Sequence, residues 1–450
     1  MKLETSKENI SYCLIMLLAS FLVWPSAIQS IILISFIIFS IYSYFSDKNN
    51  AWCDKKKMYP LLIIISFYLF HLLSFFWSKN LHNWTKIYQH NIIFPFFIFS
   101  IFHNDYKINF SQFKTILLFF NVSLVLFLIK FYIIFIKQIS YCQSCILATK
   151  PIHLIGYPIN TLPFLSQLKE LLYLRYINTN RWEFPYSLFL TAQKLNYKEI
   201  FDHHTYISAI IVICIFINVY LFIHTKCLKF KSIFILINLF YLYFLLILDS
   251  SINKILVFIP LLYILYTLKW KKKVITLLGL SLLFSTILLY KIYPILISNI
   301  EFYQIIPDVD ESKVILDFTR KHIYQYSLNI WLQSKNYLFG IGTSGFIEQL
   351  NEDLRKLNYP EIFNKTITYN THCDYLKFLV SGGLINLFLY LTCIFYLIYL
   401  SYKNNTFLFF SIFILVFSNS LIENYFDRIW GVYIYCFFIL LNKKFNEMKI

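Results

Sequence analysis

Long apolar runs are the feature of this sequence that most limits how it can fold. They measure about 17–25 residues, the length of α-helix that crosses about 30 Å of hydrocarbon. Of the 450 residues, 58% are hydrophobic and 14% are charged, whereas soluble proteins carry about 25% charged residues. The alternation of apolar and polar residues that a transmembrane β-barrel needs is not seen. The sequence therefore predicts an all-α, polytopic membrane protein.

The apolar runs predict about twelve transmembrane helices, and the lysines predict their orientation. The N-terminal run has no small-residue cleavage site, so we interpret it as the first span and not as a cleaved signal. The predicted spans are residues 11–26, 29–46, 59–77, 89–103, 114–137, 205–223, 232–248, 252–268, 274–292, 373–400, 406–420 and 429–441.

With twelve spans, the lysine-rich loops "DKNNAWCDKKKM", "HTKCLKFK" and "KWKKK" fall on the same side as the C-terminal "NKKFNEMKI". Lysine and arginine mark the cytoplasmic side, so we expect both termini in the cytoplasm. This bias accounts for most of the net charge of +17, which therefore does not indicate a nucleic-acid partner.

Two long segments then lie outside the cytoplasm. Apolar residues recur at helical spacing in "LSQLKELLYLRYI" and "RKHIYQYSLNIWLQS", which predicts short amphipathic helices at the outer mouth of the bundle. The predicted parts are helices 1–5 (residues 1–137), a first periplasmic loop (138–204), helices 6–9 (205–292), a second, catalytic loop (293–372), and helices 10–12 with a cytoplasmic tail (373–450).

Polar residues that suit chemistry gather in the second loop. Arg320 shares a helical face with Tyr324, and the glycine-rich "FGIGTSGF" follows. Gly340 and Gly342 permit positive φ, so they either form a tight turn between helices or offer backbone N–H groups to phosphate oxygens. His372 precedes the tenth span and is either an interfacial cap or a general base, since an ordinary histidine pKa near 6.5 suits that role.

Lys254 lies just inside the outer end of the eighth span. Such a lysine either extends its ammonium to the lipid headgroups or, if it faces the bundle interior, marks a functional site.

This pattern resembles the O-antigen ligase and O-antigen polymerase family of bacterial envelopes. The resemblance rests on an arginine followed by an aromatic residue, a Gly-Ile-Gly turn, a His-x-Asp step and a Gly-Gly pair, which here are Arg320, Tyr324, Gly340, Ile341, Gly342, His372, Asp374, Gly382 and Gly383. "HLLSFFWSKN", "FDHHTYISAI" with His204 and "LIENYFDRIWG" with Glu423 also resemble the family. Where the family usually has Ser-Arg, this chain has Asn253-Lys254, and lysine lacks the bidentate fork of arginine.

The resemblance implies transfer of a glycan from a polyprenyl diphosphate at the periplasmic face of the bacterial inner membrane. An acceptor hydroxyl, on lipid A-core or on another glycan, attacks the anomeric carbon and the lipid diphosphate leaves. It implies catalytic roles for His372, as the base, and Arg320. It also implies diphosphate binding by Arg320, Lys254, Gly340 and Gly342, with His204, Tyr324 and Glu423 as accessory residues and no metal or other cofactor.

Several alternatives stay open at this point. Ligase, polymerase and protein O-oligosaccharyltransferase share the same chemistry, and a lipid-linked glycan flippase is the alternative that is not an enzyme. A flippase favours polar residues at mid-membrane and related halves with broken helices, which are not evident here. Asp308 and Asp310 match the Asp-x-Asp motif of nucleotide-sugar enzymes, but such sugars are not expected outside the cytoplasm. Cys142 and Cys145 are too few for a structural zinc site and would form a small disulfide at most.

Overall fold

A computed structural model gives the fold of this chain. It describes residues 2–24, 26–46, 55–78, 93–104, 106–148, 153–154, 157–158, 204–247, 251–259, 322–356, 370–404, 406–427 and 429–449. The helices are α1 (Lys2–Ala19), η1 (Phe21–Val23), α2 (Ser26–Ser46), α3 (Lys55–Leu73), η2 (Ser74–Trp77), α5 (Ile93–His103), α6 (Phe110–Ala148), α9 (His204–Ile223), α10 (Leu228–Ile247), α11 (Ser251–Leu256), α15 (Thr343–Lys356), α16 (Asp374–Lys403), α17 (Phe407–Asn419), η5 (Tyr425–Asp427) and α18 (Ile429–Lys449). A further helix covers residues 322–333.

The helices confirm a multi-pass α-helical membrane protein. Five of them are long and apolar enough to cross a membrane, within α2, α6, α9, α10 and α16. Shorter apolar helices cover Tyr59–Leu73, Phe94–His103 and Phe407–Asn419. The only strands among the described residues are β1 (His153–Leu154) and β2 (Tyr157–Pro158), which form a two-residue antiparallel ladder. The count of twelve spans stays a prediction, because the span expected at 274–292 lies outside the described residues.

Two helices end at other residues than the predicted spans do, for local reasons. The first span was expected to reach residue 26, but α1 ends at Ala19 and the chain is extended at Trp24, with φ −87° and ψ 146°. Trp24 precedes Pro25, and a residue before proline is disfavoured in the α conformation. The fifth span was expected to end at residue 137, but α6 continues to Ala148. Its last turns, "QISYCQSCILA", contain no glycine or proline that would end a helix.

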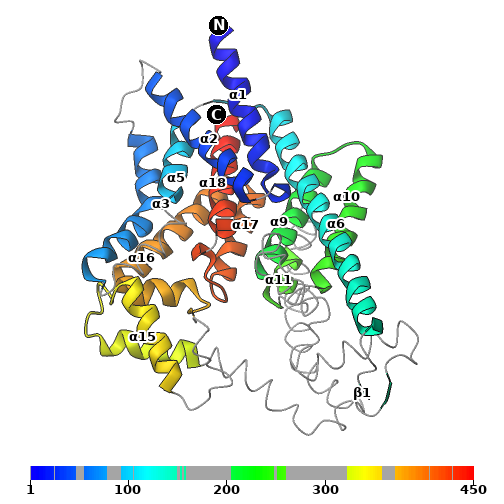
Figure 1. The fold of residues 1–450 in the computed structure, drawn as a ribbon. Coiled ribbons are helices and arrows are strands. Elements are labelled where there is room, and N and C mark those ends of the chain that lie inside the picture. Colours follow the sequence, from blue (N-terminus) through cyan, green and yellow to red (C-terminus); the bar gives the residue numbers. More distant parts are fainter. Residues whose placement is uncertain are drawn as a thin grey trace, which may run out of the picture. The chain divides into compact units, whose positions relative to one another are not determined.

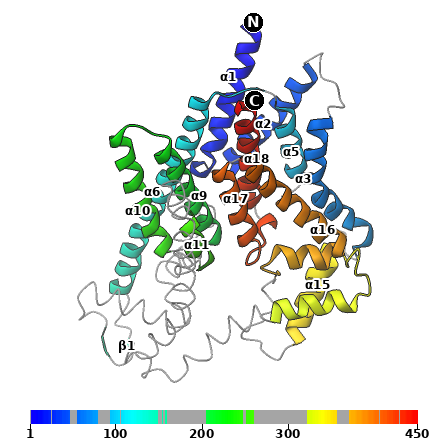
Figure 2. The ribbon, with the colours of Figure 1, turned by 180° about the vertical axis from the view of Figure 1, so that it is seen from behind.

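The chain forms two compact units. The first contains Met1–Ser123, Ile213–Lys231 and Phe318–Ile450, and the second contains Leu124–Val212 and Ser232–Asp317. The first unit therefore combines the N-terminal helices with residues 318–372 of the second predicted loop and with the C-terminal helices. Both chain termini lie at one end of this unit, and α15 lies at the other (Figures 1 and 2). The expectation that the second loop and the termini face opposite sides of the membrane stays a prediction.

In the first unit α16 lies against α3 (Figure 1), and an aromatic core holds the two helices together. The ring of Phe67 on α3 lies 5.5 Å from that of Phe378 and 5.4 Å from that of Tyr390, both on α16. Phe426, in the turn before α18, lies 5.4 Å from Phe67 and completes the cluster. Edge-to-face aromatic pairs of this kind stabilise a core beyond the area they bury.

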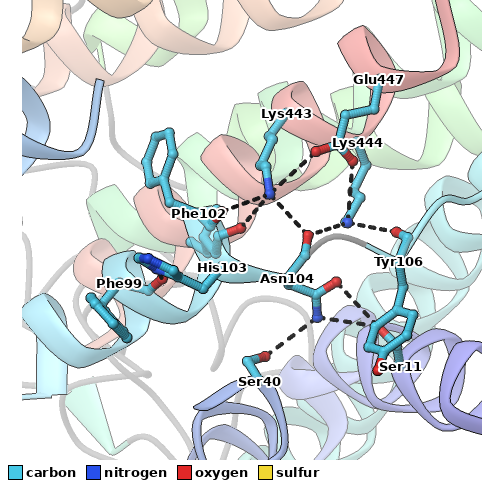
Figure 3. Close-up of polar contacts among 11 residues, drawn as sticks. Ser11, Ser40, Phe99, Phe102, His103, Asn104, Tyr106, Lys443, Lys444 and Glu447 are labelled. Carbon is cyan, nitrogen blue, oxygen red and sulfur yellow. Dashed lines mark hydrogen bonds and ion pairs between the residues drawn. The ribbon is translucent and has the colours of Figure 1, made fainter. Parts of the chain in front are cut away.

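At the end of the first unit where the chain termini lie, two lysines of α18 bind the end of α5 (Figure 3). The ammonium groups of Lys443 and Lys444 donate hydrogen bonds of 2.6–3.1 Å to the main-chain carbonyls of Ile101, Phe102, Asn104 and Tyr106. The last carbonyls of a helix have no partner within the helix and carry partial negative charge, so cations stabilise them. These lysines, predicted only as charges of a cytoplasmic tail, are therefore structural.

In the second unit, Asn253 joins α11 to the start of α9. Its side-chain N–H group donates to the carbonyl of Thr205 at 3.3 Å and to the hydroxyl of Ser208 at 3.0 Å, and all three residues are buried. A buried amide with these partners fixes the orientation of α11, and with it the position of the neighbouring Lys254.

Candidate active site

The main chain around His372 is held by Asn424, which lies in the turn after α17. The Asn424 Oδ1 accepts hydrogen bonds from the Thr371 hydroxyl at 2.8 Å and from the Cys373 N–H at 2.7 Å. Asn424 and both neighbours of His372 are buried. Because one amide oxygen binds the residues on both sides of His372, the position of that histidine is tightly fixed.

Asp374, the first residue of α16, strengthens the same junction. Its buried carboxylate accepts the Tyr425 N–H at 2.8 Å, and its own N–H donates to the Ser420 carbonyl at 2.9 Å. A carboxylate in the first turn is also favoured by the positive end of the helix dipole. The start of α16 and the turn at 420–425 therefore form one interlocked unit.

His372 pairs with Glu423 across this junction. The Nδ1 of His372 lies 3.7 Å from Oε2 of Glu423, and the side chains are 32% and 7% exposed. His372 has a φ of 45°, which few residues other than glycine adopt. Its N–H donates to Oδ1 of Asn370 at 3.2 Å, and its carbonyl accepts the Tyr324 hydroxyl at 3.3 Å from the helix at 322–333. Local interactions thus hold a partly exposed imidazole against a buried carboxylate.

The structure brings together three of the predicted site residues, His372, Glu423 and the accessory Tyr324. His204 is the first residue of α9 and Lys254 lies half-buried on α11, so both stand at ends of helices of the second unit. Arg320 lies outside the described residues, as do Asp308 and Asp310. Cys142 and Cys145 lie in the last turns of α6, and their disulfide stays a prediction.

Gly340 and Gly342 form a tight contact between chain segments. The N–H of Gly340 donates to the Asn336 carbonyl at 2.8 Å, and that of Gly342 donates to the Ser381 carbonyl at 2.9 Å. Their N–H groups are therefore engaged and cannot also bind phosphate in this conformation. Of the two roles that the sequence left open for these glycines, this conformation shows the turn, and diphosphate binding stays a prediction.

Gly383 forms the other side of this contact. It breaks the α-helical conformation inside α16, with φ 70° and ψ −169°. A Cβ atom at Gly383 would lie 2.2 Å from the carbonyl group of Leu338, and one at Gly340 would lie 2.4 Å from the Val380 carbonyl oxygen. The Gly-Gly step therefore lets the turn at 337–342 pack backbone to backbone on the kink of α16.

A buried polar cluster around His71 was not predicted as functional. Nδ1 of His71 on α3 lies 3.1 Å from Nδ2 of Asn386, and its Nε2 lies 3.3 Å from the Thr343 hydroxyl at the start of α15. Lys377 is also buried on α16, with its ammonium 5.7 Å from the centre of the Phe378 ring. The sequence does contain a sign of this cluster, because His71 and Lys377 are ionisable residues within predicted spans, and such residues are commonly functional.

Among the described residues, no group of three or more His, Cys, Asp or Glu side chains is placed to hold a metal ion. Metal-independent chemistry nevertheless stays a prediction.

Comparison with known families gives one match. Residues 234–391 match the family model described as O-antigen ligase, which supports the family resemblance seen in the sequence. This range contains Lys254, Arg320 and His372, whereas Glu423 lies beyond it. No curated protein matched the chain.

Proposed function

Because this chain carries a domain of the O-antigen ligase family at residues 234–391, we propose that it transfers a glycan from a polyprenyl diphosphate to an acceptor hydroxyl. The reaction takes place at the periplasmic face of the bacterial inner membrane, with both termini in the cytoplasm. A membrane enzyme is suited to this donor, because the lipid tail stays in the bilayer while the diphosphate and glycan remain at its surface. The acceptor is another glycan, lipid A-core or a protein.

The observation that carries this proposal is the His372–Glu423 pair. The carboxylate lies on the Nδ1 side of the imidazole, at 3.7 Å, so it favours the tautomer with hydrogen on Nδ1. The lone pair on Nε2 is then available to take a proton. Hydrogen bonds between catalytic groups are often long without substrate and shorten once it binds.

In the proposed reaction, Nε2 of His372 takes the proton of the acceptor hydroxyl as its oxygen attacks the anomeric carbon. A new carbon–oxygen bond forms, the bond from the anomeric carbon to the diphosphate breaks, and the lipid diphosphate leaves with the electron pair. The imidazolium that forms beside Glu423 is stabilised by the carboxylate.

Charge on the departing diphosphate requires a second set of groups. We assign this role to Arg320 and Lys254, as the family resemblance implies. Positive charges aimed at a developing anion lower the barrier most where water is excluded. With two cations in this role, the reaction needs no metal ion.

The test is transfer by the purified chain in nanodiscs, supplied with a polyprenyl-diphosphate-linked glycan and an acceptor glycan or lipid A-core. The proposal predicts an extended or ligated product, with one lipid diphosphate released for each glycan transferred, and the same rate in the presence of a chelator. Movement of intact donor across a bilayer with no bond broken would instead identify a flippase. Loss of transfer on chelation would overturn the metal-free mechanism.

A further inference from the structure

Four large side chains with apolar surface are exposed on the first unit: Phe76, at the end of the predicted third span, and Tyr337, Leu338 and Phe339, in the predicted second outer loop. They are together called the interfacial ledge. Phe76 is 78% exposed and Leu338 55% exposed, whereas Tyr337 and Phe339 are 44% and 43% exposed. The Phe339 ring lies 5.9 Å from that of Trp77, so the turn at 337–339 packs beside the short helix η2 that contains Phe76. Loops that face water rarely gather so many exposed apolar side chains.

Main-chain hydrogen bonds hold the ledge residues Tyr337 and Leu338 at one position along α16. The N–H of Leu384 donates to the Tyr337 carbonyl at 2.9 Å, and the N–H of Ile385 donates to the Leu338 carbonyl at 3.3 Å. Both donors lie within the candidate membrane span of α16. The turn is therefore held beside the part of α16 that follows its kink.

The ledge is continuous with side chains that face lipid. On α16, Leu384 and Phe388 are exposed, and on α3 Leu69 and Leu73 are exposed. The Phe339 ring also stacks on Phe70 of α3, at 6.2 Å, so the ledge joins the exposed surfaces of both helices. Both helices are predicted to span the membrane, so their exposed apolar side chains are expected to face lipid. The ledge adjoins these side chains, so lipid is expected to cover it as well.

Other residues indicate where the lipid surface ends. Trp331 lies 5.3 Å from the Tyr337 ring and donates its ring N–H to the Tyr337 carbonyl at 3.3 Å. Tryptophan and tyrosine prefer the boundary between headgroups and acyl chains. In α15, by contrast, Glu348, Glu352 and Arg355 are exposed, as expected for a helix in water.

We propose that the interfacial ledge inserts into the outer leaflet of the membrane and binds phospholipid at the border between headgroups and acyl chains. The second outer loop is then anchored to the bilayer by the ledge as well as by its two ends. This anchor would hold the start of α15 and the kink of α16 at the level of the lipid surface. The inference does not depend on the proposed transfer reaction.

The test is photo-crosslinking in the full-length chain, with p-benzoylphenylalanine at Leu338 in one variant and at Glu352 in another. Each variant is reconstituted in nanodiscs of phosphatidylethanolamine and phosphatidylglycerol, irradiated, and weighed by intact mass spectrometry. We expect covalent phospholipid adducts at Leu338 to exceed those at Glu352 several-fold. A third variant, with the photoreactive residue at Phe76, replaces one aromatic side chain with another and covers the case in which the Leu338 variant fails to fold. Equal lipid yields at the ledge and at Glu352, or crosslinking of the ledge to a second copy of the chain, would overturn the proposal.

Discussion

Replacement of Lys444 by methionine tests whether the C-terminal helix is held by its buried ammonium. Methionine has nearly the same length and removes only the charge and the donors. Lys444 is 0% exposed and donates to the carbonyls of Asn104 and Tyr106, both at 2.6 Å. Lys443 also donates to the Asn104 carbonyl, at 2.9 Å, so that oxygen keeps a partner in the variant. The Tyr106 carbonyl loses the ammonium that it binds.

The expected cost follows from these contacts. Each hydrogen bond lost from a charged donor costs about 1.5–3 kcal/mol, and Lys444 donates two to main-chain carbonyls. The Tyr106 carbonyl is only partly buried, so its loss of a partner adds little to this cost. We therefore expect Lys444→Met to lower the free energy of unfolding by about 3–5 kcal/mol. Because Lys443 shares an acceptor with Lys444, the double methionine variant should lose more than the two single variants together.

Thermal unfolding in detergent, followed by the loss of the monodisperse species, measures this effect. Lys356→Met is the matched control, because Lys356 is 74% exposed and forms an ion pair with Asp353 at 2.8 Å. Exposed ion pairs contribute little to stability, so this variant should unfold almost as the wild type does. Equal losses of stability for Lys444→Met and Lys356→Met would refute the reasoning, since burial and carbonyl capping would then make no difference.

The remaining predictions concern the kink of α16 and the site. Gly383→Ala should lower the free energy of unfolding by about 3 kcal/mol or more, and with it the unfolding temperature, because alanine disfavours the φ of 70° at this position and its Cβ would meet the Leu338 carbonyl group. An unchanged unfolding temperature would contradict the backbone contact between Gly383 and Leu338. Glu423→Gln should slow transfer about 10–10²-fold at unchanged protein level, since the imidazolium of His372 loses its counter-charge; wild-type turnover would remove Glu423 from the mechanism. Lys254→Arg should retain substantial transfer while Lys254→Ala and Lys254→Gln fail, and equal activity of all three would leave Lys254 outside the diphosphate site.

The fold follows from the sequence where one physical signal dominates. Apolar runs predict α2 and α9 closely, because a helix in lipid must satisfy every backbone hydrogen bond internally. Helix ends are harder to predict from the sequence, because the residues that favour or oppose a helix end do so only weakly. Pro25 accounts for the extended Trp24 but not for the end of α1 at Ala19, and the end of α6 depends on how far a helix continues without a stop signal. The roles of Lys443 and Lys444 depend on the end of α5, which lies far away in the chain.

The site is less predictable, because its contacts join distant segments. Spacing along the chain gives no sign that Glu423 faces His372, and only the family resemblance brought Glu423 into consideration. Gly340 and Gly342 suit a turn and a phosphate loop equally well until the partners of their N–H groups are known. His71 and Asn386 come from helices that the sequence does not pair, so the polar cluster between them is visible only after folding.

Single-turnover transfer by His372→Ala, in the same nanodiscs and with the same lipid-linked donor as the wild type, tests the central claim most directly. The removal of a positioned base costs about 10²–10⁴-fold in rate. The matched control is His224→Ala, which removes an exposed imidazole whose Nδ1 lies 2.8 Å from the Tyr220 carbonyl. We predict that His372→Ala loses at least about 10²-fold in transfer rate, with normal amounts in the membrane and normal donor binding, while His224→Ala transfers at the wild-type rate. Transfer by His372→Ala at a rate close to that of the wild type would contradict the assignment of His372 as the base.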